Sequence, residues 1–128
     1  MKSYLFLLML APTIAFINPD SSVSAISKAI SAGDAEQLSK YFDSNVEVAV
    51  LDNEDVYDVS GAKKVISDFF TKNKPKSFNA IHQGTSKGKD SQYLIGNLVA
   101  GDASYRVYLY MKVNGDSYLI QELRFDEE

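Results

Sequence analysis

Few residues of this sequence have the chemistry of a catalyst. The 128 residues include one histidine, His82, and no cysteine, which excludes the common structural zinc sites. His82 lies in Phe78–Gly84, a run that we expect to be a β-strand, and on a buried side of that strand its imidazole could act as an acid or base. A histidine that is hydrogen-bonded or exposed at the sheet rim is the commoner arrangement, and the sequence leaves both faces open.

Three carboxylates fall inside strand-like runs and could also exchange protons. Glu47 alternates with valines, so we expect its side chain to face solvent. Glu122 is expected to pair with Arg106 on the neighbouring strand. Asp58 and His82 therefore remain the two open candidates for a catalytic acid or base, and either would have to lie in a pocket beside apolar residues.

The acidic run Asp52–Asp55 is the one segment whose composition suggests a cation site. A calcium loop of the EF-hand type needs glycine at its sixth position and two flanking helices, but Tyr57 holds that position and the neighbouring runs are strand-like. The Gly-rich run Gly84–Lys89 is one position shorter than a phosphate-binding loop. We therefore predict a plain acidic hairpin turn, a surface loop, no metal site and no cofactor.

The N-terminus has the composition of a secretory signal peptide. Met1–Ser3 carries one positive charge, and Tyr4–Ile17 is almost wholly apolar and uncharged, which is the order that export signals share. The run is shorter than the about 20 residues that a membrane span needs. We predict a signal peptide at residues 1–17, a single domain at residues 18–128 and a periplasmic or secreted location. A buried N-terminal helix is the alternative.

The charge of the exported part argues against two classes of partner. Without Lys2 the chain keeps 12 basic and 17 acidic residues, a net charge of −5. Nucleic acid and anionic lipid surfaces both attract cationic proteins, so neither is expected as a partner, and no stable membrane span is expected once the signal is cleaved. The lack of cysteine excludes a lipid anchor on that residue and leaves the fold to its core alone.

Hydrophobic spacing predicts an α+β fold in which helices precede strands. Helical periodicity indicates a first helix that ends at Gly33, a second that Asp34 caps and a third that ends before Pro75. Alternating or Val-rich runs predict a hairpin and four long strands: Asn45–Leu51 and Val56–Val59, then Phe78–Gly84, Gln92–Ala100, Ser104–Val113 and Ser117–Phe125. We expect three N-terminal helices and a short hairpin packed on a four-stranded antiparallel sheet.

Four stretches carry a resemblance to known proteins: Ala29–Ala35, Leu51–Asp55, Asp68–Phe70 and Tyr118–Phe125. They resemble an uncharacterised family of exported Bacteroidetes proteins that is classed as a domain of unknown function. The order of the elements is similar to the nuclear-transport-factor-2-like (cystatin-like) superfamily, which includes ketosteroid isomerase, scytalone dehydratase and the polyketide cyclases. The resemblance implies a strongly curved sheet that forms a cone with the helices. It transfers no catalytic residue, because the Asp and His motifs of these enzymes have no match here, and fold alone does not give function.

The last two strands are predicted to share a tyrosine-rich face. Side chains alternate along Ser104–Val113, so the side that holds Tyr105 packs against the helices and the other side stays uncovered. A three-residue hairpin loop with a bulge at Gly115 places residues of like parity opposite one another. A strict two-residue Asn114-Gly115 turn would instead place Tyr110 opposite Leu119. In the preferred bulged register the uncovered face pairs Arg106 with Glu122, Tyr108 with Ile120 and Tyr110 with Tyr118.

This uncovered face and the cone suggest two binding functions. Tyr and Arg are enriched at protein interfaces, and large exposed apolar patches often mark them, so we expect a homodimer through this face; a wet tyrosine surface is the alternative. The cone could hold a small apolar ligand near four polar side chains: Tyr41, His82, Tyr105 and Gln121. The leading hypothesis is a non-catalytic binding or interaction module. A small-molecule enzyme of the isomerase or dehydratase type and an accessory subunit of another protein are the alternatives.

Overall fold

The computed structural model describes residues 19–85 and 90–128. Within these residues the chain forms three helices and six strands in the order α1 (Pro19–Ala32), α2 (Ala35–Ser39), β1 (Phe42–Val50), β2 (Asn53–Asp58), α3 (Val59–Lys72), β3 (Pro75–Thr85), β4 (Ser91–Ala100), β5 (Ala103–Asn114) and β6 (Ser117–Glu127). The predicted signal peptide, residues 1–17, lies outside the described residues. In the described part, no helix is both long and apolar enough to cross a membrane.

Local sequence explains how the helices begin and end. Gly33 has a φ of +67°, a conformation that favours glycine, and it lets α1 turn directly into α2. Oδ1 of Asp34 accepts a hydrogen bond from the Gln37 N–H at 3.0 Å, which confirms the predicted cap. In the same way, Oδ1 of Asp58 accepts a hydrogen bond from the Gly61 N–H at 2.7 Å and starts α3.

All six strands form one sheet, in the order β2-β1-β6-β5-β4-β3. β1 and β6 run parallel, and every other neighbouring pair is antiparallel. The prediction of a four-stranded antiparallel sheet with a separate hairpin was therefore wrong, because the hairpin extends the sheet at β6. Val48 lies opposite Leu123 and both side chains are buried, so the pairing covers an edge of β6 that would otherwise be exposed. The α+β class and the three helices are confirmed.

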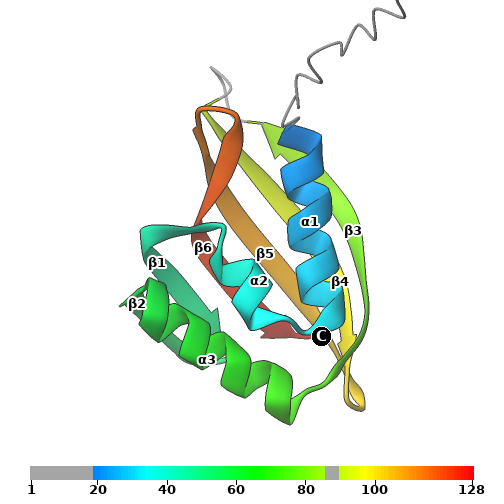
Figure 1. Cartoon of the computed structure of the whole chain (residues 1–128). Coiled ribbons are helices and arrows are strands. Elements are labelled where there is room, and N and C mark those ends of the chain that lie inside the picture. The colour runs from blue at the N-terminus through cyan, green and yellow to red at the C-terminus, as the bar shows by residue number, and fades with distance from the viewer. Residues whose placement is uncertain (1–18, 86–89) are drawn as a thin grey trace, which may run out of the picture.

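The helices cover one face of the sheet, which we call the inner face (Figure 1). α1 packs against β3 and β6, α3 packs against β1 and β2, and α2 lies between α1 and α3. The opposite face, which we call the outer face, has no described helix over it. The sheet curves around the helices, so the two faces of the same strands meet very different surroundings.

Side chains fill the space between the inner face and the helices. The ring of Phe125 on β6 is fully buried, with its centroid 4.5 Å from that of Phe69 and 6.0 Å from that of Phe70, both on α3. Tyr105 on β5 meets the Phe69 ring edge-on at 5.2 Å, an arrangement that aromatic pairs favour. The aromatic layer therefore occupies the part of the cone that lies under α3.

The turn between β5 and β6 differs from both predicted registers. Asn114 lies opposite Ser117, so the turn residues are Gly115 and Asp116, and the pairing shifts by one residue between Tyr110 and Met111. The extra residue is Gln121, a β-bulge that changes which way the following side chains point. Between the turn and the bulge, an odd-numbered residue therefore lies opposite an even-numbered one. Beyond the bulge, residues that are both odd or both even lie opposite each other.

Candidate functional site

The bulge corrects the predicted composition of the tyrosine-rich face. Ile120 lies opposite Met111 and is fully buried, and Tyr118 is also buried, so neither belongs to the outer face as predicted. Beyond the bulge, Tyr110 lies opposite Glu122. Between the turn and the bulge the observed pairing differs from the predicted one by an odd number of residues, so Tyr118 and Ile120 face inward. Beyond the bulge the difference is even, and the predicted face is restored.

The predicted pairing of Arg106 with Glu122 was also wrong. Arg106 lies opposite Asp126, and its Nη2 is 3.2 Å from Oε1 of Glu128. Oε1 of Glu122 lies 3.4 Å from Nη1 of Arg124, on its own strand. Both residues nevertheless lie on the outer face, as do Tyr108 and Tyr110, so four of the six predicted interface residues share that face.

The four predicted ligand-binding residues do not meet in one pocket. Tyr105 is on the inner face and donates a hydrogen bond from its hydroxyl to Oδ1 of Asn73 at 3.0 Å. Gln121, the bulge residue, donates from Nε2 to Oδ2 of Asp43 at 3.0 Å. Tyr41 lies half-buried beside a hollow between α1 and α2. Each hydroxyl or amide is thus held in a separate part of the fold.

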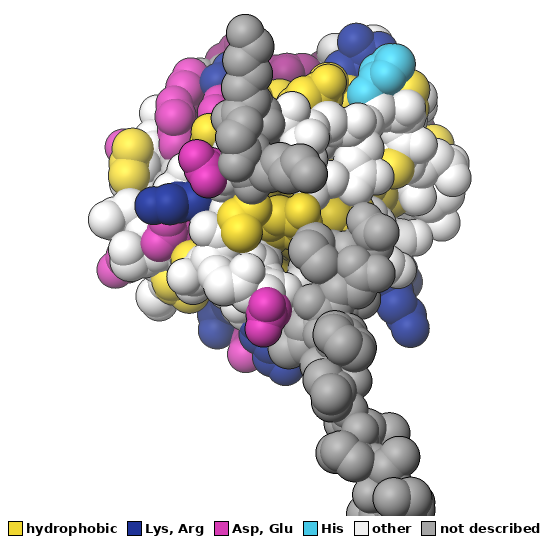
Figure 2. Space-filling view, turned by 90° about the horizontal axis from the view of Figure 1, so that it is seen from above, with side chains coloured by type: hydrophobic (Ala, Val, Ile, Leu, Met, Phe, Trp, Pro, Cys, Tyr) yellow, Lys and Arg dark blue, Asp and Glu magenta, His cyan; other side chains and the backbone are white. Residues whose placement is uncertain are grey.

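His82 lies on the outer face, away from the cone. It is opposite Ile95 of β4 and is exposed, and Figure 2 shows it at the surface beside basic side chains. Asp58, the other candidate acid or base, is exposed and holds the N-terminus of α3. Neither side chain is placed as a catalytic group in an apolar pocket would be.

The outer face of β3 to β6 is rich in apolar and aromatic side chains. Tyr93 on β4 lies opposite Tyr110 on β5, and Ile95 lies opposite Tyr108. Tyr93 is 39% exposed and Val99 is 37% exposed. Burial among these neighbours, together with the charge of Glu122, raises the pKa of the Tyr108 phenol. The Tyr108 side chain at the centre of the face is therefore partly withdrawn from water.

Carboxylates gather on the other half of the outer face. Glu47 lies opposite Glu122, and a hydrogen bond with Glu54 raises the pKa of the Glu47 carboxyl. Nη1 of Arg124 lies 3.3 Å from Oε1 of Glu54, and the hydrogen bond with Glu47 and this cation lower the pKa of Glu54. In contrast, β3 and β4 contain no acidic residue. The face is thus divided into an acidic half and a half without carboxylates.

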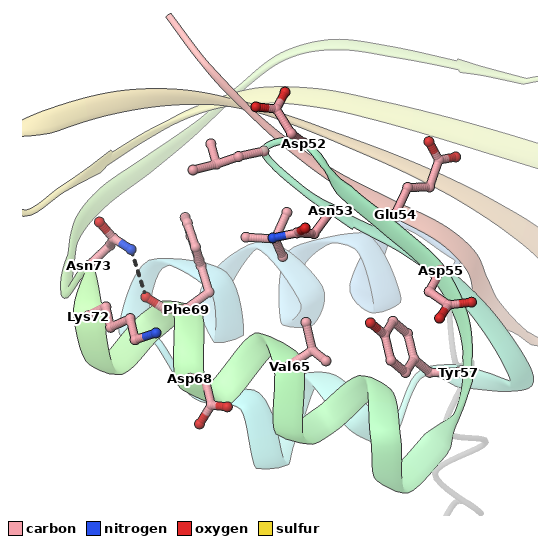
Figure 3. Close-up of a pocket in the computed structure, with 12 residues that line it drawn as sticks. Asp52, Asn53, Glu54, Asp55, Tyr57, Val65, Asp68, Phe69, Lys72 and Asn73 are labelled. Carbon is pink, nitrogen blue, oxygen red and sulfur yellow. Dashed lines mark hydrogen bonds between the residues drawn. The ribbon is translucent and has the colours of Figure 1, made fainter.

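A cleft of about 660 Å³ separates α3 from the β1–β2 hairpin (Figure 3). Val65 and Phe69 of α3 and Tyr57 of β2 project toward it, and Nδ2 of Asn73 donates to the Phe69 carbonyl at 3.1 Å at one end. Its rim holds the acidic turn that the sequence singled out, and this cleft was not predicted. The sequence does contain its parts, an acidic run followed closely by a helix with an apolar side. It does not show how the hairpin docks on that helix, and the docking is what creates the cleft.

The described part of the chain contains no cluster of side chains that could hold a metal ion. No group of three or more His, Asp and Glu side chains there lies close enough to share a metal ion. The predicted acidic turn was only partly right: Leu51 and Asp52 form the turn, and Asn53–Asp55 belong to β2. The carboxylates of this run do not converge.

Comparison with known proteins places the chain in a family. A family described as Domain of unknown function (DUF4783) matches residues 23–126. The chain belongs to this family. The DUF4783 protein of Bacteroides ovatus has a solved structure with 30% sequence identity and a TM-score of 0.77, covering 82% of this chain and 94% of that chain. The DUF4783 protein of Bacteroides uniformis gives 26% identity and a TM-score of 0.76, covering 82% and 95%.

The wider comparison fixes the fold of DUF4783 and nothing about its activity. An NTF-2-like protein of unknown function from Silicibacter pomeroyi is 12% identical with a TM-score of 0.63, covering 85% of this chain and 92% of that chain. The search of curated proteins found no match. The resemblances to a Bacteroidetes family and to the nuclear-transport-factor-2-like fold are thus confirmed.

Proposed function

We propose that this domain is a non-catalytic interaction module that forms a homodimer through the outer face of β3 to β6. The observation that carries the proposal is the cluster of Tyr93, Ile95, Tyr108 and Tyr110 on neighbouring strands with no described helix over it. Aromatic residues at the centre of an uncovered face are the composition of an interface core. From the signal-like N-terminus we also propose that the module acts outside the cytoplasm.

The size of the face fits a stable interface. Four strands of 10 to 12 residues, spaced about 4.8 Å apart and rising about 3.3 Å per residue, span on the order of 700 Å² of sheet. A standard interface buries about 800 Å² on each partner. Side chains add accessible area to the projected area of the sheet, so the outer face is large enough.

The charge distribution favours a second copy as the occupant. A two-fold axis parallel to β5 would set β6 of one protomer over β4 of its partner, and β1 over β3. Glu47 and Glu122 of one protomer would then lie over the half of the partner that has no carboxylate and holds Tyr93 and His82. The aromatic centre, around Tyr108, would meet itself, while like charges would stay apart.

The test is the mass of the purified protein in solution. We expect twice the monomer mass at about 100 µM by light scattering or native mass spectrometry, since interfaces of this size bind with micromolar or tighter affinity. Tyr108→Lys should raise the dissociation constant of the dimer at least about 30-fold. Ser67→Lys on the exposed side of α3 is the matched control and should leave it unchanged. A monomer at about 100 µM contradicts the proposal.

A further inference from the structure

We propose that the cleft between α3 and the β1–β2 hairpin binds a small amphiphilic cation, meaning a protonated amine attached to an apolar body. The cleft holds about 660 Å³, which is within the range of pockets that take small molecules. It lies on the helix side of the hairpin (Figure 3) and shares no residue with the aromatic centre of the outer face, so its function does not depend on the dimer, although Glu54 borders both.

The floor of the cleft suits the apolar body. Val65 and Phe69 of α3 and Val50 of β1 line it, and the ring of Tyr57 projects toward it from β2. Phe69 is almost fully buried, while Val65 and Tyr57 are half-buried. An apolar group seated here would remove water from side chains that are already partly covered, which is favourable by the hydrophobic effect.

The rim of the cleft suits a positive charge. Four carboxylates and one ammonium group line it: Asp52, Glu54, Asp55, Asp68 and Lys72. Arg124 compensates Glu54 at 3.3 Å, and the other three carboxylates outnumber the single lysine. Figure 3 shows the carboxylates of Asp52, Glu54 and Asp68 pointing outward from the edges of the cleft rather than onto its floor. They stay hydrated there and still make the mouth of the cleft negative, which draws cations toward it.

Lys72 lies at the opposite end of the cleft from Asp55 (Figure 3). It lies on the last turn of α3, near Asn73, whereas Asp52 and Asp55 belong to the hairpin. We therefore expect the ligand's ammonium group at the hairpin end and its apolar body toward Phe69. Removing the charge of Lys72 should tighten binding of a cation, and removing the charge of Asp52 should weaken it.

Leu51 reaches the cleft from a strained turn. It is the only non-glycine residue with a positive φ among the described residues, at +56°, and its side chain is 43% exposed while it lines the cleft. A leucine in the left-handed region is strained, and Gly or Asn would fit a tight hairpin turn better. The Leu51 N–H donates to the Phe125 carbonyl at 2.9 Å, which holds the turn in place. Strain of this kind is common where a side chain serves binding rather than stability.

Three probes of one size and different charge test the ligand class. We would titrate 2-phenylethylamine, 2-phenylethanol and phenylacetate into the uniformly ¹⁵N-labelled protein at pH 7 and follow backbone amide shifts. The amine should shift amides in residues 50–57 and 65–73, and should bind at least about threefold more tightly than the alcohol and more tightly still than the anion. About 0.5 M salt should reduce the advantage of the amine. Equal binding of amine and alcohol, or shifts confined to other residues, would overturn the proposal.

Variants that should change the affinity for the amine in opposite directions separate an effect on binding from an effect on folding. Asp52→Asn should weaken binding of the amine about threefold, and Lys72→Gln should tighten it about threefold. Leu51→Gly should weaken binding at least fivefold while the thermal midpoint stays the same or rises, because strain is relieved. Asp116→Asn, in the β5–β6 turn, removes an equal charge far from the cleft and should change nothing. An unchanged affinity in Leu51→Gly, or a weaker one in Lys72→Gln, counts against the site.

Discussion

The two faces of β5 both carry large side chains at their centres, but only the inner face is buried. On the inner face Val107, Leu109 and Met111 are fully buried under the helices. On the outer face Tyr108 and Tyr110 are half-buried among one another and charged neighbours. The outer row also holds the exposed side chains Arg106 and Lys112, so charge separates the ends of the two rows, whereas their centres are both apolar or aromatic. The difference comes from what covers each face, and an uncovered apolar face in a folded chain is a place where another molecule can still bind.

The largest effect that tests this comparison is the loss of an inner-face aromatic ring. Phe125→Ala should lower the free energy of unfolding by about 3–5 kcal/mol, because a fully buried ring leaves a cavity beside Phe69 and Phe70. The loss should be the same at about 1 µM and about 100 µM protein in urea denaturation.

Tyr108→Ala is the counterpart of that variant on the outer face. It should cost about 1 kcal/mol or less at about 1 µM, and more at about 100 µM, because a dimer links stability to protein concentration. If the cost of Tyr108→Ala shows no dependence on concentration, the outer face is not occupied by a second copy. If Phe125→Ala costs about as little as Tyr108→Ala, the inner face is not the packed core described here.

A smaller effect compares two glycines that lie under aromatic rings. A Cβ at Gly96 on the inner face would lie 2.4 Å from Cζ of Phe78 and 2.8 Å from the backbone oxygen of Asn79. Because the backbone cannot move away, Gly96→Ala should destabilise the protein by about 1–3 kcal/mol. A Cβ at Gly84 would meet the far end of the Tyr93 ring at 2.5 Å, and that ring can swing toward solvent on the outer face.

Gly84→Ala should therefore cost less than about 1 kcal/mol, because Ala also reduces the freedom of the unfolded chain. Urea midpoints of the two variants and the parent protein are the measurement. Equal losses would mean that Tyr93 is held as firmly as Phe78, and the outer face would then be rigid before any partner binds.

The sequence predicted elements well and their assembly less well. Each strand was placed within a few residues, because alternation and turn residues are local signals. The joining of β1 to β6 was missed, since a parallel pairing between distant segments leaves no local mark. The bulge at Gln121 was missed for the same kind of reason: Asn114 and Gly115 indicate a turn, but they do not fix where the ladder slips.

The candidate site residues show the same contrast: local alternation was predicted correctly, and tertiary arrangement was not. Tyr108, Tyr110, Arg106 and Glu122 share the outer face as predicted, because alternation along one strand and beyond the bulge still holds. Tyr118 and Ile120 did not, since one extra residue reverses the face. The cleft under the hairpin depends on how α3 docks against β2, and two segments that are adjacent in sequence gave no sign of the space left between them.

The smallest effect concerns the acidic half of the outer face and its dependence on pH. The hydrogen bond with Glu54, then burial and the nearby Glu122, raise the pKa of Glu47 in the folded protein. A raised carboxyl pKa means that the folded state holds this proton more tightly than the unfolded state. The contribution to stability is therefore complete below the ordinary pKa of 4.5 and is lost as pH rises through the folded value. Glu54, whose pKa is lowered, contributes with the opposite sign and loses its contribution as pH falls.

Glu47→Gln keeps a hydrogen-bond donor toward Glu54 and removes the repelling charge. The variant should be slightly more stable than the parent protein at pH 7 in low salt, and the difference should vanish near pH 4, where Glu47 is protonated in both states. Urea denaturation at the two pH values measures it, with exposed Glu127→Gln as the control that should show no such change. A variant that is less stable at pH 7 would mean that Glu47 is held by attraction to Arg124 rather than strained by its two acidic neighbours. The carboxylates of the acidic half would then be balanced by Arg124 within one protomer. In that case, charge repulsion would not favour the proposed two-fold arrangement, which places this half over the carboxylate-free half of the partner.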